Sequence, residues 1–186
     1  MTMAAGSSNA IIDRAIRVAR LDEAAYEEVA RDPAATTQAL MIVIGVAILG
    51  GVGALRGGGG ALVSAVLFGP LAWVLSSALI YFVGSRLFNV QGVTWIEVAR
   101  ATGFAQVPSA LNVFGIIPIV GALVGLVVLV WSLATGFFAV RTSMHLETGQ
   151  AIITLVVSWV IAAVVIGTLF FVVLGAGMGA GMMTGR

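Results

Sequence analysis

The residues best suited to acid–base chemistry are few, and they lie in one short polar segment, 141–150. His145 and Glu147 share this segment with Arg141. One histidine and one carboxylate are too few for a zinc site, and their spacing is not that of the two-histidine helix motif of metalloproteases. The chain has no Cys, which also excludes disulfides and thiolate metal sites. We interpret His145 and Glu147 as solvated loop residues and expect no catalytic, cofactor or metal site.

A second group of polar side chains recurs at helical spacing within an apolar segment: Thr102, Gln106, Ser109 and Asn112. In hydrocarbon such groups need hydrogen-bond partners, so this polar stripe should face the interior of a helix bundle. One interpretation is a path or pocket for a small polar solute, lined by a carbonyl that Pro108 frees. The other is hydrogen bonding between helices, with Pro108 as a static kink. We favour the second interpretation because no ionisable residue joins the stripe.

The amino-acid composition indicates the environment that surrounds these residues. The chain has 186 residues, of which 60% are hydrophobic and 9% are charged, and its mean hydropathy is +1.13. A soluble domain is about half apolar and about one quarter charged. The lipid bilayer must therefore surround most of this chain, and the fold class is an all-α, polytopic membrane helix bundle. The net charge of +1 gives no reason to expect nucleic acid as a partner.

The apolar segments predict a membrane domain over 34–174 with five transmembrane helices. The predicted spans are approximately 34–55, 61–84, 96–114, 118–140 and 151–174. Thr94 and Glu97 have the spacing of a capping box, which places the start of the third helix at Trp95. A Gly- and Met-rich tail, 175–186, is expected to be loosely ordered.

The third predicted span has two possible arrangements in the membrane. Residues 101–140 contain no charge, and as one helix they would be about 60 Å long, twice the hydrocarbon thickness. The chain must therefore fold back, and Pro118 is the best position because it cannot continue the preceding helix. Residues 101–117 could span the bilayer or form a re-entrant loop. The length of the segment favours a span.

The polar residues 1–33 predict an amphipathic, cytoplasmic helical segment, with Asp22 capping its second helix. Arg14, Arg17 and Arg20 could lie on an anionic lipid surface. Alternatively, the segment packs on the cytoplasmic ends of the bundle, which we favour because its apolar residues are small. The arginines also predict orientation, because they gather in this segment and in the loops on the same side. We expect an inner-membrane protein with a cytoplasmic N-terminus.

Small residues mark candidate turns and packing faces. Pro108, Pro118 and Gly121 are the candidate hinge and turn positions. Gly121 and Gly125 form a G-x-x-x-G pattern, which lets helices approach closely. Packing within the chain is favoured over self-association, because glycine is abundant and chance matches are expected.

The arrangement of these segments resembles the Yip family of integral membrane proteins, named for interaction with Ypt/Rab GTPases, and its short prokaryotic members in particular. The resemblance rests on the stretches TWIEVARATGFAQVPSAL and FGIIPIVGALVGLVVLVWSLATGFFAVR, with fixed points at the following positions: Glu97, Gly103, Pro108, Pro118, Gly121 and Trp131. It implies a five-span protein with a cytoplasmic N-terminus. Eukaryotic relatives act in vesicle traffic and bind prenylated GTPases. No residue of this chain supports a GTPase contact.

Two hypotheses for function follow. The first is a non-enzymatic membrane adaptor, scaffold or accessory subunit, whose partners are the lipid bilayer and other membrane proteins or further copies of itself. The alternative is a small transporter or channel that uses the polar stripe. An intramembrane enzyme is disfavoured, because apart from Glu97 at the start of the third, no predicted span contains Asp, Glu, His, Cys or Lys.

Overall fold

The computed structural model describes the backbone of residues 3–184 and the side chains of residues 10–165 and 168. The described residues form helices and connecting turns, with no strand. The helices are α1 (Met3–Ala19), α2 (Glu23–Arg31), α3 (Ala35–Gly53), η1 (Leu55–Gly57), α4 (Gly60–Phe88), α5 (Trp95–Phe104), η2 (Val107–Ile116), α6 (Pro118–Ser143) and α7 (Thr148–Thr184). The all-α prediction is confirmed.

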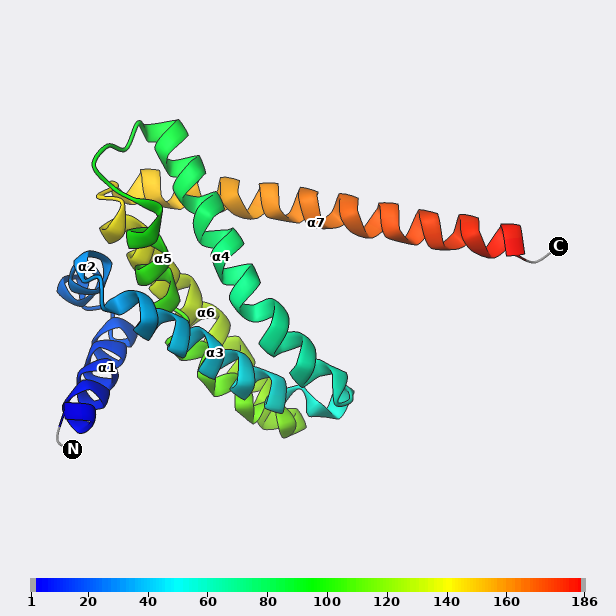
Figure 1. Ribbon diagram of the computed structural model, residues 1–186, viewed down its shortest axis with the longest axis horizontal. Coiled ribbons are helices and arrows are strands. Elements are labelled where there is room, and N and C mark those ends of the chain that lie inside the picture. Colours follow the sequence, from blue (N-terminus) through cyan, green and yellow to red (C-terminus); the bar gives the residue numbers. More distant parts are fainter. Residues whose placement is uncertain (1–2, 185–186) are drawn as a thin grey trace.

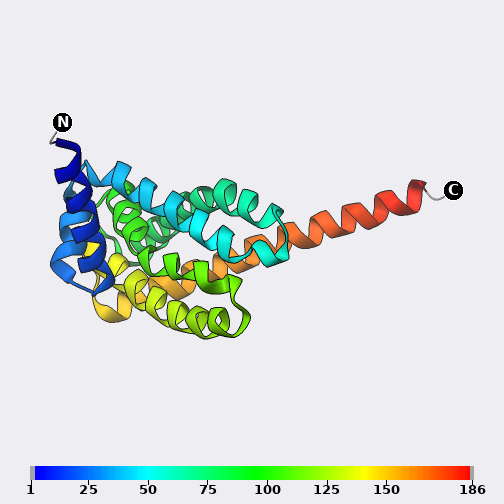
Figure 2. The ribbon, with the colours of Figure 1, turned by 90° about the horizontal axis from the view of Figure 1, so that it is seen from below.

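In the part of the chain that the structure describes, four helices are long and apolar enough to cross a bilayer: α3, α4, α6 and the part of α7 from Thr148 to Val165. The chain is therefore a multi-pass membrane protein. Helix α3 packs against both α4 and η2, and α6 packs against η2 on its other side. In Figure 1, α3 and α6 lie along a similar axis with opposite chain directions, whereas α7 diverges from the bundle. Figure 2 shows α1 running across one end of the bundle rather than along it.

The two ends of the bundle differ in composition. We call the end that carries α1, α2 and the loops at 89–94 and 144–147 the polar end. The opposite end, which we call the apolar end, carries the turn around η1 and the turn between η2 and α6.

Two of the helix starts form as the sequence predicts. Asp22 caps α2, because its side chain accepts a hydrogen bond of 3.0 Å from the Ala24 N–H. Thr94 and Glu97 form the capping box of α5, and the Thr94 N–H donates to Glu97 Oε2 at 2.6 Å. Each cap satisfies N–H groups that have no partner within the helix.

The segment 96–114, predicted as one helical span, is instead divided into α5 and the 3-10 helix η2. Pro108 explains the break, because its ring would clash with the Phe104 carbonyl in a continuous α-helix, and α5 ends at Phe104. At 1.5 and 2.0 Å per residue, α5 and η2 would be about 15 and about 20 Å long. Their combined length is comparable to the roughly 30 Å of the hydrocarbon core.

Helix α7 is longer than its predicted span of 151–174. It continues through most of the predicted tail, 175–186, and ends at Thr184. It contains no proline, the residue that most strongly ends a helix.

The buried core lies towards the polar end. One cluster joins α1 to α6 around Val18, Tyr26, Trp73 and Phe104. The Trp73 indole N–H donates to the Ala99 carbonyl at 3.0 Å and ties α4 to α5. A second cluster joins α4, α5, α6 and α7.

Candidate functional site

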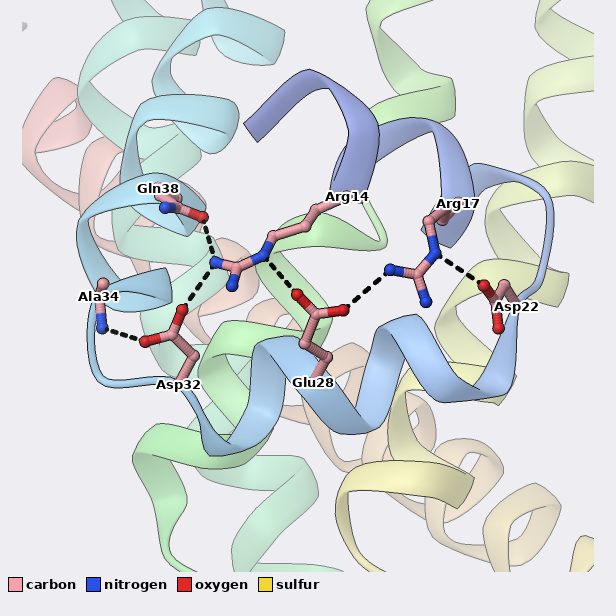
Figure 3. Close-up of polar contacts among 7 residues, drawn as sticks. All are labelled: Arg14, Arg17, Asp22, Glu28, Asp32, Ala34 and Gln38. Carbon is pink, nitrogen blue, oxygen red and sulfur yellow. Dashed lines mark hydrogen bonds and ion pairs between the residues drawn. The ribbon is translucent and has the colours of Figure 1, made fainter. Parts of the chain in front are cut away.

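Arg14 joins three elements at the polar end (Figure 3). Its guanidinium contacts Glu28 Oε1 at 2.8 Å and Asp32 Oδ2 at 2.7 Å, and it donates to Gln38 Oε1 at 3.1 Å. Its side chain is only 18% exposed. Charge-assisted bonds from one planar group to two carboxylates fix geometry as well as adding energy. Arg14 therefore holds α1 against α2 and against the first turn of α3.

Arg17 makes the second set of ion pairs between α1 and α2. It contacts Asp22 Oδ2 and Glu28 Oε2, each at 2.8 Å (Figure 3). Arg20 is exposed, and no carboxylate among the described side chains pairs with it. Of the three arginines considered as candidates for a lipid surface, Arg14 and Arg17 are thus engaged within the protein, as the favoured packing interpretation requires. The reason is that three carboxylates on or next to α2, those of Asp22, Glu28 and Asp32, lie close enough to pair with them.

These contacts keep the carboxylates charged. The hydrogen bond from Arg17 lowers the pKa of Asp22 and of Glu28, and Arg14 adds to the effect at Glu28. The backbone N–H of Ala34 lowers the pKa of Asp32, again with help from Arg14. An opposite charge or a hydrogen bond to the charged form favours ionisation. The ion pairs are consequently complete at neutral pH.

Tyr26 anchors α2 to its neighbours. Its side chain is fully buried, its hydroxyl donates to the Val18 carbonyl at 2.9 Å, and its ring stacks on Phe138 of α6 at 6.2 Å between centroids. Burial raises the pKa of Tyr26, so its hydroxyl remains a neutral donor.

Two side chains of α6 hold the loop that joins α1 to α2. The Trp131 indole N–H donates to the Ala19 carbonyl at 2.7 Å, and Arg141 contacts Glu23 Oε1 at 2.7 Å. Trp131 therefore satisfies a carbonyl at the end of α1 that has no partner within the helix. We call α1 and α2, fixed in this way, the N-terminal platform.

Arg100 holds the other end of the platform. Its guanidinium donates to the Ala30 carbonyl at 2.9 Å and to Thr36 Oγ1 at 2.7 Å. Nothing in the local sequence around Arg100 or Arg141 indicates these structural roles. The only available signal was the abundance of acidic residues in α2, which implies that basic partners lie nearby.

The four residues of the polar stripe are divided between α5, the turn that follows it and η2. Thr102 lies on α5 and donates to a carbonyl of its own helix at 2.8 Å, and Gln106 lies in the turn before η2. Ser109 on η2 lies 3.2 Å from Ser132 on α6, whereas Asn112 is exposed. The Ser109–Ser132 bond between helices is of the kind that the structural interpretation requires.

The candidate turn and packing residues have different surroundings. Pro108 is buried in the first turn of η2, and Pro118 begins α6. A β-carbon added at Gly121 would lie 2.6 Å from the Gly115 Cα, so Gly121 packs within the chain where η2 meets α6. A β-carbon at Gly125 would meet nothing within 4 Å. Of the two glycines of the G-x-x-x-G pattern, only Gly121 therefore lies at a close packing contact.

His145 and Glu147 lie in the exposed loop between α6 and α7. His145 has a φ of 51° and lines a pocket of about 190 Å³ with Glu27, Arg31 and Glu97 among others. Among the described residues, no three His, Asp or Glu side chains are grouped in a way that could hold a metal ion.

Comparisons with known proteins bear on the whole of this arrangement. The model of the Yip1 domain matches residues 20–181, which include α2 and every crossing helix. The comparisons with curated proteins and with solved structures found no significant match. Because the match covers nearly the whole chain, the protein belongs to the Yip1 domain family of membrane proteins.

Proposed function

We propose that this chain is a non-enzymatic membrane adaptor or scaffold, in which the apolar helices anchor the protein and the polar end contacts other proteins. The observation that carries this proposal is the N-terminal platform itself. Two helices outside the apolar spans are held in one orientation by Arg14, Arg17, Arg100 and Arg141. A surface fixed before binding loses less conformational entropy when a partner docks.

The platform is accompanied by neighbouring polar surface. The α6–α7 loop is close to it, because Glu27 and Arg31 of α2 line the same pocket as His145. Arg31 is exposed beside this pocket, and Glu147 is exposed in the same loop, two residues after His145. A partner could contact the platform and the loop together.

We further propose that the polar end faces the cytoplasm of an inner membrane, and that α5 and η2 together make a fifth crossing. The bias of arginine towards the polar end supports the orientation. The contacts of both ends support the crossing. Arg100 of α5 reaches Thr36 at the start of α3, whereas Asn112 of η2 lies against Gly53 at the end of α3.

Site-specific photo-crosslinking in native membranes tests the adaptor proposal. A photoreactive amino acid is placed at Arg31 on the platform, at Glu147 in the loop and, as a control, at Ile119, which is 78% exposed on α6 near the apolar end. The adaptor proposal predicts that positions 31 and 147 capture the same protein and that position 119 captures lipid. Capture of lipid alone at all three positions would refute it.

A double variant separates the adaptor from the transporter. Gln106→Leu with Asn112→Leu removes two polar groups of the stripe and leaves the platform intact. The adaptor proposal predicts unchanged crosslinking at positions 31 and 147, and no solute flux through reconstituted native protein. Flux that the double variant abolishes, without loss of folded protein, would favour the transporter.

A further inference from the structure

One face of α6 carries an open apolar groove next to the platform. The groove has a volume of about 520 Å³ and is lined by Leu126, Val127, Val130, Trp131 and Ala134. Its lining is almost wholly apolar, as a surface in contact with hydrocarbon must be. Trp131 is also the residue whose indole N–H binds the carbonyl at the end of α1. The groove therefore begins where α1 ends.

A row of exposed side chains runs along one side of α1 and ends at Arg20, the residue after Ala19. Ile12, Ile16 and Arg20 are spaced four residues apart, so they follow one another along the same side of the helix. Ile12 is 57% and Ile16 is 45% exposed, although both are large apolar residues. Arg20 at the end of the row is exposed and has no carboxylate partner among the described side chains. Asp13, the acidic residue of α1, is about 10 Å away along the helix axis.

The depth of α1 follows from its contacts with α6. Arg141 holds Glu23 of α2, whereas Trp131, ten residues earlier on α6, holds Ala19 of α1. Ten residues correspond to about 15 Å along a helix. The end of α1 therefore lies deeper along α6 than the start of α2. Because α1 also runs across the bundle axis in Figure 2, it has the position and direction of a helix lying in the membrane interface.

We propose that Arg20 and the α6 groove form a binding site for one anionic phospholipid. The guanidinium of Arg20 binds the phosphate, an acyl chain lies along the groove from Trp131 towards Leu126, and Ile12 and Ile16 insert beside it. Arginine suits this role because its planar donors match phosphate geometry. The indole of Trp131 suits the headgroup level, where a ring with one polar edge is stable. The proposal does not depend on the adaptor function.

Because the chain has no Cys, a single cysteine can report on this site. Ile16→Cys is labelled with a bimane fluorophore, and the protein is reconstituted in vesicles of phosphatidylcholine and phosphatidylglycerol, with bromine atoms on one lipid or the other as quenchers. The matched control is Ile119→Cys near the apolar end. The site predicts stronger quenching at position 16 by the anionic lipid, with no such preference at position 119. Adding Arg20→Gln should reduce the preference at position 16 about fivefold, since one arginine near an anionic surface has about that effect.

Four results would overturn the proposal. Equal quenching at position 16 by both lipids, or an unchanged preference after Arg20→Gln, would mean that Arg20 does not select the headgroup. Absence of quenching would mean that α1 stands away from the bilayer. Oxidative crosslinking of Ile16→Cys into dimers in the membrane would mean that a second copy of the chain covers this face.

Discussion

At the polar end of the bundle, the helices are joined by charged side chains, whereas at the apolar end they meet through backbone atoms. Arg14 binds two carboxylates to hold α1 on α2. At the other end, a β-carbon on Gly53 would overlap the Asn112 carbonyl oxygen, so α3 and η2 touch without side chains between them. Ion pairs depend on pH and tolerate small shifts. A direct contact between two backbones contains no titratable group, so it should be sensitive to added side-chain volume and not to pH.

The difference matches the solvent at each end. Where water is available, exposed charges cost little, and several ion pairs can fix the orientation of a platform. Where hydrocarbon is close, small residues allow the packing that replaces the hydrophobic effect between helices. The two ends should therefore respond differently to substitution and to pH.

The largest effect is expected from Gly53→Ala. The new methyl group would overlap the Asn112 carbonyl, and relieving that overlap requires a shift of backbone, at a cost of about 3 kcal/mol. Gly50→Ala is the control, because a β-carbon there meets nothing within 4 Å. Thermal unfolding in detergent measures both variants. Equal melting temperatures would show that α3 and η2 are not in direct contact.

Arg14→Ala should cost less, about 2 kcal/mol, because the group is largely buried but lies beside solvent. Removing it also leaves Glu28 and Asp32 without their shared cation. The rate of thiol labelling at Val18→Cys, a fully buried position of α1, measures detachment of the platform. We expect faster labelling in the Arg14→Ala background. Arg31→Gln, which removes a more exposed ion pair, should leave the rate unchanged.

Acid should weaken the polar end in a graded way. The pKa values of Asp22, Glu28 and Asp32 are lowered in the folded state, so they add stability above their unfolded pKa values of about 4. That stability is lost as pH falls through the folded pKa values. Hydrogen exchange, corrected for intrinsic rates, should show α1 and α2 losing protection below about pH 4 while η2 retains it. Parallel loss at both ends would contradict the assignment of pH dependence to the platform.

The smallest effect is expected from Trp131→Phe. Phenylalanine keeps most of the ring but cannot donate to the Ala19 carbonyl, and one such hydrogen bond contributes about 1 kcal/mol. Labelling at Val18→Cys should rise slightly. An unchanged labelling rate would mean that the Trp131 hydrogen bond does not help to attach α1, and that its ion pairs with α2 are sufficient.

Local signals in the sequence were sufficient for some features and insufficient for others. Asp22 and the Thr94–Glu97 pair predicted helix starts, because caps act within four residues. The division of 96–114 was not predicted, because a membrane proline such as Pro108 can bend a helix or end it, and the neighbouring helices decide which. The pairing of Arg14 with Glu28 depends on how α1 folds against α2, so spacing along the chain could not identify it.

We propose that the whole polar end lies on one side of the membrane and that α5 and η2 cross from it to the apolar end. Single cysteines at Gln91, Glu147, Arg56 and Ile117, all exposed positions, test it with a membrane-impermeant thiol reagent. We expect positions 91 and 147 to react from the cytoplasmic side and positions 56 and 117 to react from the opposite side. A different result would contradict this arrangement: position 117 reacting from the same side as position 91, and position 147 from the same side as position 56. Residues 101–117 would then form a re-entrant loop, and the polar end would not be one surface.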